Sequence, residues 1–253
     1  MTAQKGFVYE ENVVKFLAPL GFCENVTAGA SHDRPDLMLV SGKKKAGCEL
    51  KIGAASAGSL VLKYENNKWQ FNDTSDDPEK DFLAAVAKEV KLFDLIKKKW
   101  KNKPLKRKPV DAALKAQMGK MTKKQLYEAD LANFPDIKGT VPASVIENYY
   151  ARKKTYYVNV GTHGFYLFGN SDPLKYNQRL QKLGMDKIPQ FGQKAEATFR
   201  ARVQYKGSGN YQFTFEIQFS IKSANKSPYN IGKVKGNNDV KIDVQGSDIS
   251  CLA

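Results

Sequence analysis

Two short apolar segments decide the fold of this chain: RPDLMLV at residues 34–40 and AGCELKI at residues 46–52. The residues between them read SGKKK, a polar sequence with a glycine, which is typical of a turn. Segments of this length and composition on either side of a turn predict two β-strands joined as a hairpin.

The second predicted strand carries two charged side chains on one face. Successive side chains of a strand point to opposite faces, so Glu49 and Lys51 are expected to lie opposite Cys48 and Leu50. An ordinary solvated sheet surface would account for an isolated pair of this kind. Asp36, however, begins the partner strand after a proline, and we expect its carboxylate to reach the same place.

Two carboxylates and a lysine at one place provide a site for a hard divalent cation. Mg²⁺ prefers oxygen ligands, keeps several waters and takes one or two carboxylates. The bound ion lowers the pKa of a water and stabilises charge on a phosphate oxygen, while a neighbouring lysine orients or deprotonates that water. Asp36, Glu49 and Lys51 therefore indicate phosphodiester hydrolysis.

The order of these residues resembles a known nuclease signature. Pro35-Asp36, followed after twelve residues by Glu49-Leu50-Lys51, resembles the PD-(D/E)XK motif of the restriction-endonuclease-like superfamily. Upstream, KGFVYE at residues 5–10 opens a stretch with helical periodicity, and TAGAS follows at residues 27–31. This N-terminal part is similar to archaeal Holliday-junction resolvases, in which a glutamate of the first helix joins the metal site. By position that residue is Glu10, with Glu11 as the alternative.

The resemblance implies a fold, a cofactor and a partner. The expected fold class is mixed α/β: a restriction-endonuclease-like core with a central mixed sheet flanked by helices. Asp36, Glu49 and Glu10 would hold Mg²⁺, for which Mn²⁺ would substitute, and Lys51 would act on the water. The partner would be double-stranded DNA, as for the type II restriction endonucleases that the chain resembles most. A homodimer is also open, because a symmetric DNA site matches a two-fold protein.

Length and composition agree with a globular protein. The chain has 253 residues, of which 42% are hydrophobic, enough for one large domain. We expect residues 1–75 to begin the catalytic core, residues 76–155 to form a helical basic insertion, and residues 156–253 to be rich in β-structure. No apolar run approaches the length needed to cross a bilayer, and the N-terminus lacks the apolar core of a signal peptide, which predicts a cytoplasmic protein without a membrane partner.

The charge of the chain points to a polyanion. Lys and Arg total 41 against 26 acidic residues, a formal net charge of +15. Such an excess favours nucleic acid as the partner, since no single basic amphipathic helix suited to a membrane surface stands out. Three scattered cysteines and two histidines argue against a disulfide framework, a zinc ribbon and a nuclease built on a histidine cluster.

The densest basic run follows a predicted helix. Helical periodicity extends from Asp81 to about Trp100 and ends in the basic run. Two interpretations are open: a solvated, mobile loop, or an arm that grips phosphates and adds affinity independent of sequence. The candidate DNA-binding residues here are Lys97, Lys98, Lys99, Lys106, Arg107 and Lys108.

Residues 197–221 predict a long antiparallel ribbon with one apolar and one polar face. Arg200, Arg202 and Gln204 lie on the polar face, and such side chains can hydrogen-bond to base edges in a major groove, which a two-stranded ribbon fits. A solvent-exposed sheet face is the alternative.

These observations favour a Mg²⁺-dependent endonuclease that cuts double-stranded DNA at specific sites. A structure-specific junction resolvase is the nearest alternative within the class, although resolvases of the kind resembled are much shorter. The alternative from another class is a nucleic-acid-binding protein without catalysis, for which the order of Glu10, Asp36, Glu49 and Lys51 would be coincidental. RNA also stays open as a substrate.

Overall fold

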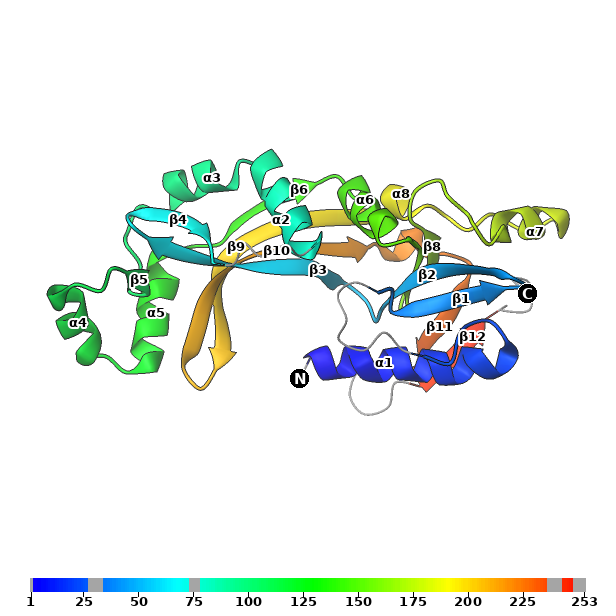
Figure 1. Cartoon of the computed structure of the whole chain (residues 1–253), viewed down its shortest axis with the longest axis horizontal. Helices are drawn as coiled ribbons and strands as arrows, with labels where there is room; N and C mark the ends of the chain where they lie inside the picture. The colour runs from blue at the N-terminus through cyan, green and yellow to red at the C-terminus, as the bar shows by residue number, and fades with distance from the viewer. Residues whose placement is uncertain (1, 27–33, 73–77, 236–242, 248–253) are drawn as a thin grey trace. The chain divides into compact units, whose positions relative to one another are not determined.

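The computed structural model describes residues 2–26, 34–72, 78–235 and 243–247 (Figure 1). The TAGAS segment at residues 27–31 lies outside this part. The chain divides into two compact units, and the expectation of a single domain stays a prediction. The first unit takes in residues up to Ala55, Pro142–Ala197 and residues from Phe219 onward; the second takes in Ser56–Val141 and Thr198–Gln218.

The first unit is built on a mixed sheet with the strand order β1-β2-β7-β8. The predicted hairpin is confirmed: β1 (Leu37–Ser41) and β2 (Lys44–Lys51) are antiparallel, with Leu37 opposite Cys48. The other neighbour of β2 is β7 (Thr155–Val160), which runs parallel to it, and β8 (Gly164–Leu167) returns antiparallel to β7. The sheet is therefore mixed, as expected.

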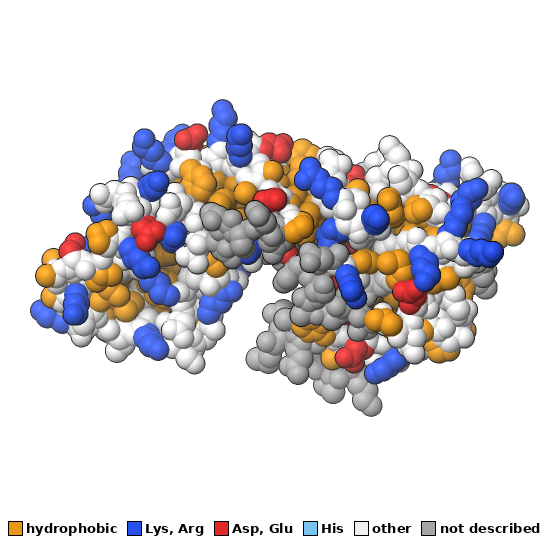
Figure 2. Space-filling model, in the orientation of Figure 1, with side chains coloured by type: hydrophobic (Ala, Val, Ile, Leu, Met, Phe, Trp, Pro, Cys, Tyr) orange, Lys and Arg blue, Asp and Glu red, His pale blue; other side chains and the backbone are white. Residues whose placement is uncertain are grey.

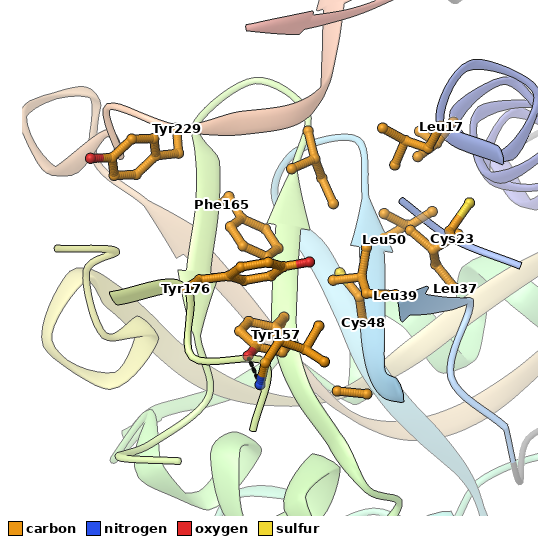
Figure 3. Packing of buried hydrophobic residues seen from close by; sticks show 14 of the residues in the cluster. Leu17, Cys23, Leu37, Leu39, Cys48, Leu50, Tyr157, Phe165, Tyr176 and Tyr229 are labelled. Atoms are coloured by element: carbon orange, nitrogen blue, oxygen red, sulfur yellow. Dashed lines mark hydrogen bonds between the residues drawn. The ribbon is translucent and has the colours of Figure 1, made fainter. Parts of the chain in front are cut away.

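The core of this unit lies against one face of the sheet (Figure 3). Cys48 and Leu50 are buried there as the strand alternation predicts, together with the stacked rings of Tyr157 and Phe165, whose centroids are 5.4 Å apart. Val13 and other apolar residues of α1 (Thr2–Leu17) belong to the same cluster. Burying each large apolar side chain contributes roughly 1.5–3 kcal/mol, so this face fixes the register of β2.

Helices cover both faces of the sheet. Leu50 packs with α1, whereas its neighbour Glu49 accepts a hydrogen bond from α6 (Ser144–Arg152), which packs against β7. Because adjacent strand residues point to opposite faces, α1 and α6 lie on opposite sides. The remaining elements of this unit are the 3₁₀ helices at Ala18–Leu20 and Ser223–Asn225, α7 (Tyr176–Lys182), α8 (Phe191–Lys194), and the antiparallel pair β11 (Asn230–Lys235) and β12 (Asp243–Ser247).

A buried polar network ties α1, β7 and β11 together. The Asn159 side-chain amide donates to Tyr9 Oη at 2.8 Å and to Asn230 Oδ1 at 3.1 Å. Tyr9 in turn donates to the carbonyl of Gly232 at 2.7 Å, and Asn159 Oδ1 accepts from the backbone N–H of Ile231 at 3.1 Å. A buried network with its members paired rigidifies a core, so α1 is held in one position relative to the sheet.

The second unit contains a sheet with the order β4-β3-β10-β9-β6, and β5 also pairs with β3. The ribbon predicted at residues 197–221 is confirmed. The bounds are β3 (Ala55–Glu65), β4 (Lys68–Phe71), β5 (Arg107–Lys108), β6 (Ile137–Val141), β9 (Ala195–Gly207) and β10 (Asn210–Ile221). The helices are α2 (Pro78–Glu89), α3 (Leu92–Lys99), α4 (Ala112–Gly119) and α5 (Lys123–Asn133). Among the described residues, no helix combines the length and the apolar character that a bilayer crossing requires.

The single helix predicted from Asp81 to Trp100 is wrong. The chain forms α2 and α3 instead, separated at Lys91, which has a left-handed backbone with φ of 50°. The last buried residue of α2 is Ala87, and the first buried residue of α3 is Leu92, five positions later. In one continuous helix, a spacing of five would turn Leu92 away from the face that contacts the core. The break brings Leu92 back to the core face, and it leaves Phe93 38% exposed.

Candidate active site

The hairpin brings the predicted aspartate, glutamate and lysine together at one end. Asp36 precedes β1, and its Oδ2 accepts a hydrogen bond of 2.8 Å from the backbone N–H of Leu50 across the hairpin. Lys51 Nζ lies 3.6 Å from that Asp36 oxygen and forms an ion pair with Glu49 Oε1. One ammonium therefore bridges two carboxylates, one just before β1 and one on β2.

A tyrosine that the sequence did not single out completes this cluster. Tyr150 of α6 donates a hydrogen bond of 2.9 Å from its buried hydroxyl to Glu49 Oε1. Its ring stacks on Phe168 with 4.8 Å between centroids, which fixes the direction of the hydroxyl. Burial and the nearby carboxylates raise the pKa of Tyr150, so the hydroxyl stays protonated and remains a donor. No motif marks this residue in the sequence.

The two glutamates of the first helix have different surroundings. Glu11 faces solvent and pairs with exposed Lys15 at 3.7 Å. Glu10 is 9% exposed, and its pKa is raised to about 8 by burial and by the charge of Asp36, partly offset by Lys51. Glu10 therefore shares the electrostatic environment of the hairpin carboxylates, and Glu11 does not.

The charges of the site perturb one another. Burial and the charge of Glu49 raise the pKa of Asp36 to about 6. For Lys51, burial lowers the pKa, but the attraction of Glu49 and Asp36 outweighs it and the net shift is upward. Without a bound cation, Lys51 is thus an ammonium at neutral pH. This protonation state suits it to donate a hydrogen bond and to orient a water or a phosphate oxygen, and does not suit it to remove a proton.

The donor set fits a magnesium-type ion at two carboxylates. Within the described residues, Asp36 Oδ2 and Glu49 Oε1 carry the hydrogen bonds, and no protein donor contacts Asp36 Oδ1 or Glu49 Oε2. Among the described residues, one oxygen of each carboxylate thus has no protein donor, and Mg²⁺ commonly takes one or two carboxylates and fills its shell with water. No set of three His, Cys, Asp or Glu side chains in the described part has the arrangement of metal ligands. Glu10 as a third ligand stays a prediction.

The basic segment after α3 is anchored to the second unit. Trp100 and Leu105 are buried, and the N–H of Leu105 donates to Asp130 Oδ1 at 2.9 Å. Lys106 Nζ donates to the carbonyl of Tyr211. Further on, β5 pairs in parallel with β3 beside a cavity of about 620 Å³. These contacts contradict the interpretation of the segment as a loop without fixed structure, while Lys97 to Lys99 remain exposed in the last turn of α3.

The polar face of the ribbon carries internal ion pairs. Arg200 pairs with Asp136, and Arg202 Nε lies 2.9 Å from Glu216 Oε1, which is buried on the neighbouring strand. Gln204 is half-buried, and its uncharged side chain does not form ion pairs. Thus the middle of this face is not the fully solvated surface of the second interpretation, and its two arginines already have carboxylate partners. Their contact with DNA stays a prediction.

Comparison with known proteins adds little to this geometry. No protein-family model matches the chain, and no curated protein matches it. Among solved structures, the chain is similar to HhaI endonuclease in complex with DNA, with 14% sequence identity, 85% of this chain and 90% of that chain covered, and a TM-score of 0.36. At this TM-score the similarity carries no inference about this chain, and the proposals below depend on its own residues.

Proposed function

We propose that this chain is a Mg²⁺-dependent endonuclease that hydrolyses phosphodiester bonds of double-stranded DNA at specific sites, with Mn²⁺ able to replace Mg²⁺. The observation that carries the proposal is the convergence of Asp36, Glu49 and Lys51 at the end of one hairpin, with one carboxylate oxygen of each acid available. Carboxylates in this number and a fixed ammonium are the groups that metal-assisted phosphodiester hydrolysis requires.

Each residue of the site has a distinct role in this proposal. Asp36 and Glu49 would hold the cation, which when bound lowers the pKa of a water and offsets charge on the phosphate. Lys51 would orient the attacking water or bind a phosphate oxygen in the transition state. Tyr150 would keep Glu49 Oε1 occupied, so that Oε2 faces the ion. The water oxygen would form the new bond to phosphorus and lose its proton to solvent, while the bond from phosphorus to the sugar oxygen breaks and that oxygen takes up a proton from solvent.

The charge of the chain supports nucleic acid as the substrate class. A net charge of +15 attracts the phosphate backbone and increases the rate of encounter. Site specificity is supported by the long ribbon of β9 and β10 with its polar face, and a junction resolvase is the alternative that the same chemistry would serve.

A cleavage experiment on a long, varied duplex such as a phage genome tests the proposal. The protein is incubated with Mg²⁺, with EDTA, and as the variants Asp36→Ala, Lys51→Ala and Lys45→Ala. Lys45 is the matched control, because it lies on the same strand but pairs with Glu24 on the exposed surface. We expect discrete fragments that need Mg²⁺, Asp36 and Lys51 and that persist in Lys45→Ala. DNA binding, measured in EDTA, should survive in the two site variants.

The other outcomes separate the alternatives. A smear of fragments would show a nuclease without site preference. Intact linear DNA combined with cleavage of a four-way junction would establish the resolvase. Intact DNA, RNA and junctions, with DNA binding retained, would refute catalysis and leave a binding protein.

A further inference from the structure

The turn end of the hairpin, opposite to the carboxylates, borders a small cavity in the first unit. Its volume is about 390 Å³. One wall comes from the β1–β2 turn and the other from α7 and the residues before it. The lining residues are Ser41, Lys43, Lys44, Leu174, Lys175, Gln178, Arg179 and Lys182.

Positive charge gathers around this cavity. Five of its lining side chains are cationic and none is a carboxylate. Lys43, Lys44, Lys175 and Lys182 are exposed, and none forms an ion pair with a described carboxylate. Figure 2 shows Lys and Arg side chains gathered at the end of the molecule where α7 lies. Like charges at this density repel one another, and a polyanion relieves that repulsion while releasing counterions.

The protein holds these cations on a fixed framework. Arg179 donates to Ser41 Oγ, which ties α7 to the hairpin. Asp172, the nearby acid, is used internally, since it accepts hydrogen bonds from the N–H groups of Tyr176 at 3.2 Å and Asn177 at 2.8 Å and from the Tyr157 hydroxyl at 2.5 Å. Its charge therefore fixes the start of α7.

The hairpin sets the distance between this cavity and the carboxylates. Five residue steps separate Lys44 from Glu49 along β2, which is about 17 Å at the rise of a β-strand. A phosphate held beside this cavity would therefore lie about 17 Å from the bond at the carboxylates, beyond the phosphates that flank that bond.

We infer that the cavity between the β1–β2 turn and α7 binds a backbone phosphate of the DNA substrate, remote from the bond that is cut. The inference rests on the proposed function for the position of the cut. It assigns to the first unit its own DNA contact, distinct from the basic segment after α3 and from the ribbon.

Neutral phosphate substitution tests this site without any need for cleavage. Duplexes with a single methylphosphonate at each position in turn are bound to the protein in EDTA, and affinity is measured by fluorescence anisotropy. We expect methylphosphonates to reduce affinity at certain positions, and at one of these positions the loss should vanish in the double variant Lys44→Gln, Lys182→Gln. For unmodified DNA, each lost contact should reduce affinity by about tenfold at 0.1 M salt and lower the salt slope by about 0.9.

Controls decide how each result is interpreted. Lys233→Gln, at an exposed lysine of β11 outside the cavity, should keep the affinity, the slope and the interference pattern of the original protein. An unchanged pattern in the double variant would overturn the inference. So would inorganic phosphate that competes with DNA at equal affinity, since the site would then be a general anion site. If interference that depends on Lys44 and Lys182 is present but no cleavage occurs under any condition, the DNA contact stands and the proposed nuclease activity fails.

Discussion

Replacing Tyr150 by phenylalanine removes a single oxygen from the candidate site and keeps its packing. The ring can still stack on Phe168, whereas Glu49 Oε1 loses the donor now at 2.9 Å. A hydrogen bond to a charged group contributes about 1.5–3 kcal/mol. Because Lys51 still pairs with the same oxygen, we expect the lower end, about 1.5 kcal/mol, in the free energy of unfolding. If the same free energy, about 1.5 kcal/mol, is needed to orient Glu49 for the cation, the variant would bind the cation about tenfold more weakly.

Two measurements check Tyr150→Phe. Chemical denaturation in EDTA gives the change in stability, and single-turnover cleavage over a range of Mg²⁺ concentrations gives the half-saturating concentration and the limiting rate. We expect the half-saturating Mg²⁺ to rise about tenfold while the limiting rate changes little. Tyr156→Phe is the matched control, since that hydroxyl makes no hydrogen bond within the described residues. If the two variants have the same Mg²⁺ dependence and stability, Tyr150 does not position Glu49.

Three other changes have defined outcomes. The pKa of Glu10 is raised to about 8, so the stability contributed by its protonated form is present at low pH and is lost as the pH rises through 8. The cation-free protein should therefore melt at a lower temperature at pH 9 than at pH 6.5. If the melting temperatures of Glu10→Gln and of the original protein change equally with pH, this prediction is wrong. Neutralising Lys97 to Lys99 should flatten the salt dependence of DNA binding by about 0.9 per contact, and an unchanged slope would mark these lysines as merely solvated. Arg202→Met leaves buried Glu216 unpaired and should lower the free energy of unfolding, measured by chemical denaturation, by about 3 kcal/mol. A loss of DNA affinity at unchanged stability would instead show that Arg202 contacts the DNA.

The hairpin and its three charged residues were predictable because they depend on local rules. Strand alternation places Glu49 and Lys51 on one face, and the turn brings Asp36 opposite that end, so a short stretch of sequence contains the geometry. The contribution of Tyr150 depends on long-range packing. Its hydroxyl reaches Glu49 only because α6 lies over the sheet, and no spacing in the sequence encodes that contact.

The charges of the ribbon illustrate a second limit of sequence reasoning. Alternation correctly placed Arg200 and Arg202 on the polar face, but periodicity does not identify the partner of a charge. Asp136 reaches Arg200 from a distant part of the chain, and Glu216 meets Arg202 across the ribbon. The break at Lys91 had a local signal, because the spacing of the apolar positions changes there. Counting apolar residues over the whole stretch from Asp81 to Trp100 conceals this change.

The parallel pairing of β2 with β7 affects when the site can form during synthesis. Glu49 of β2 is opposite Val158 of β7. Strand β2 therefore lacks this neighbour until residues more than a hundred positions later in the sequence have been made. At about 5–20 residues per second, the ribosome needs roughly 5–20 s to go from one strand to the other. During that interval Tyr150 is also missing. A nascent or prematurely terminated chain that ends before α6 therefore carries Asp36, Glu49 and Lys51 without the assembled site, and under the proposed function it would not hydrolyse DNA.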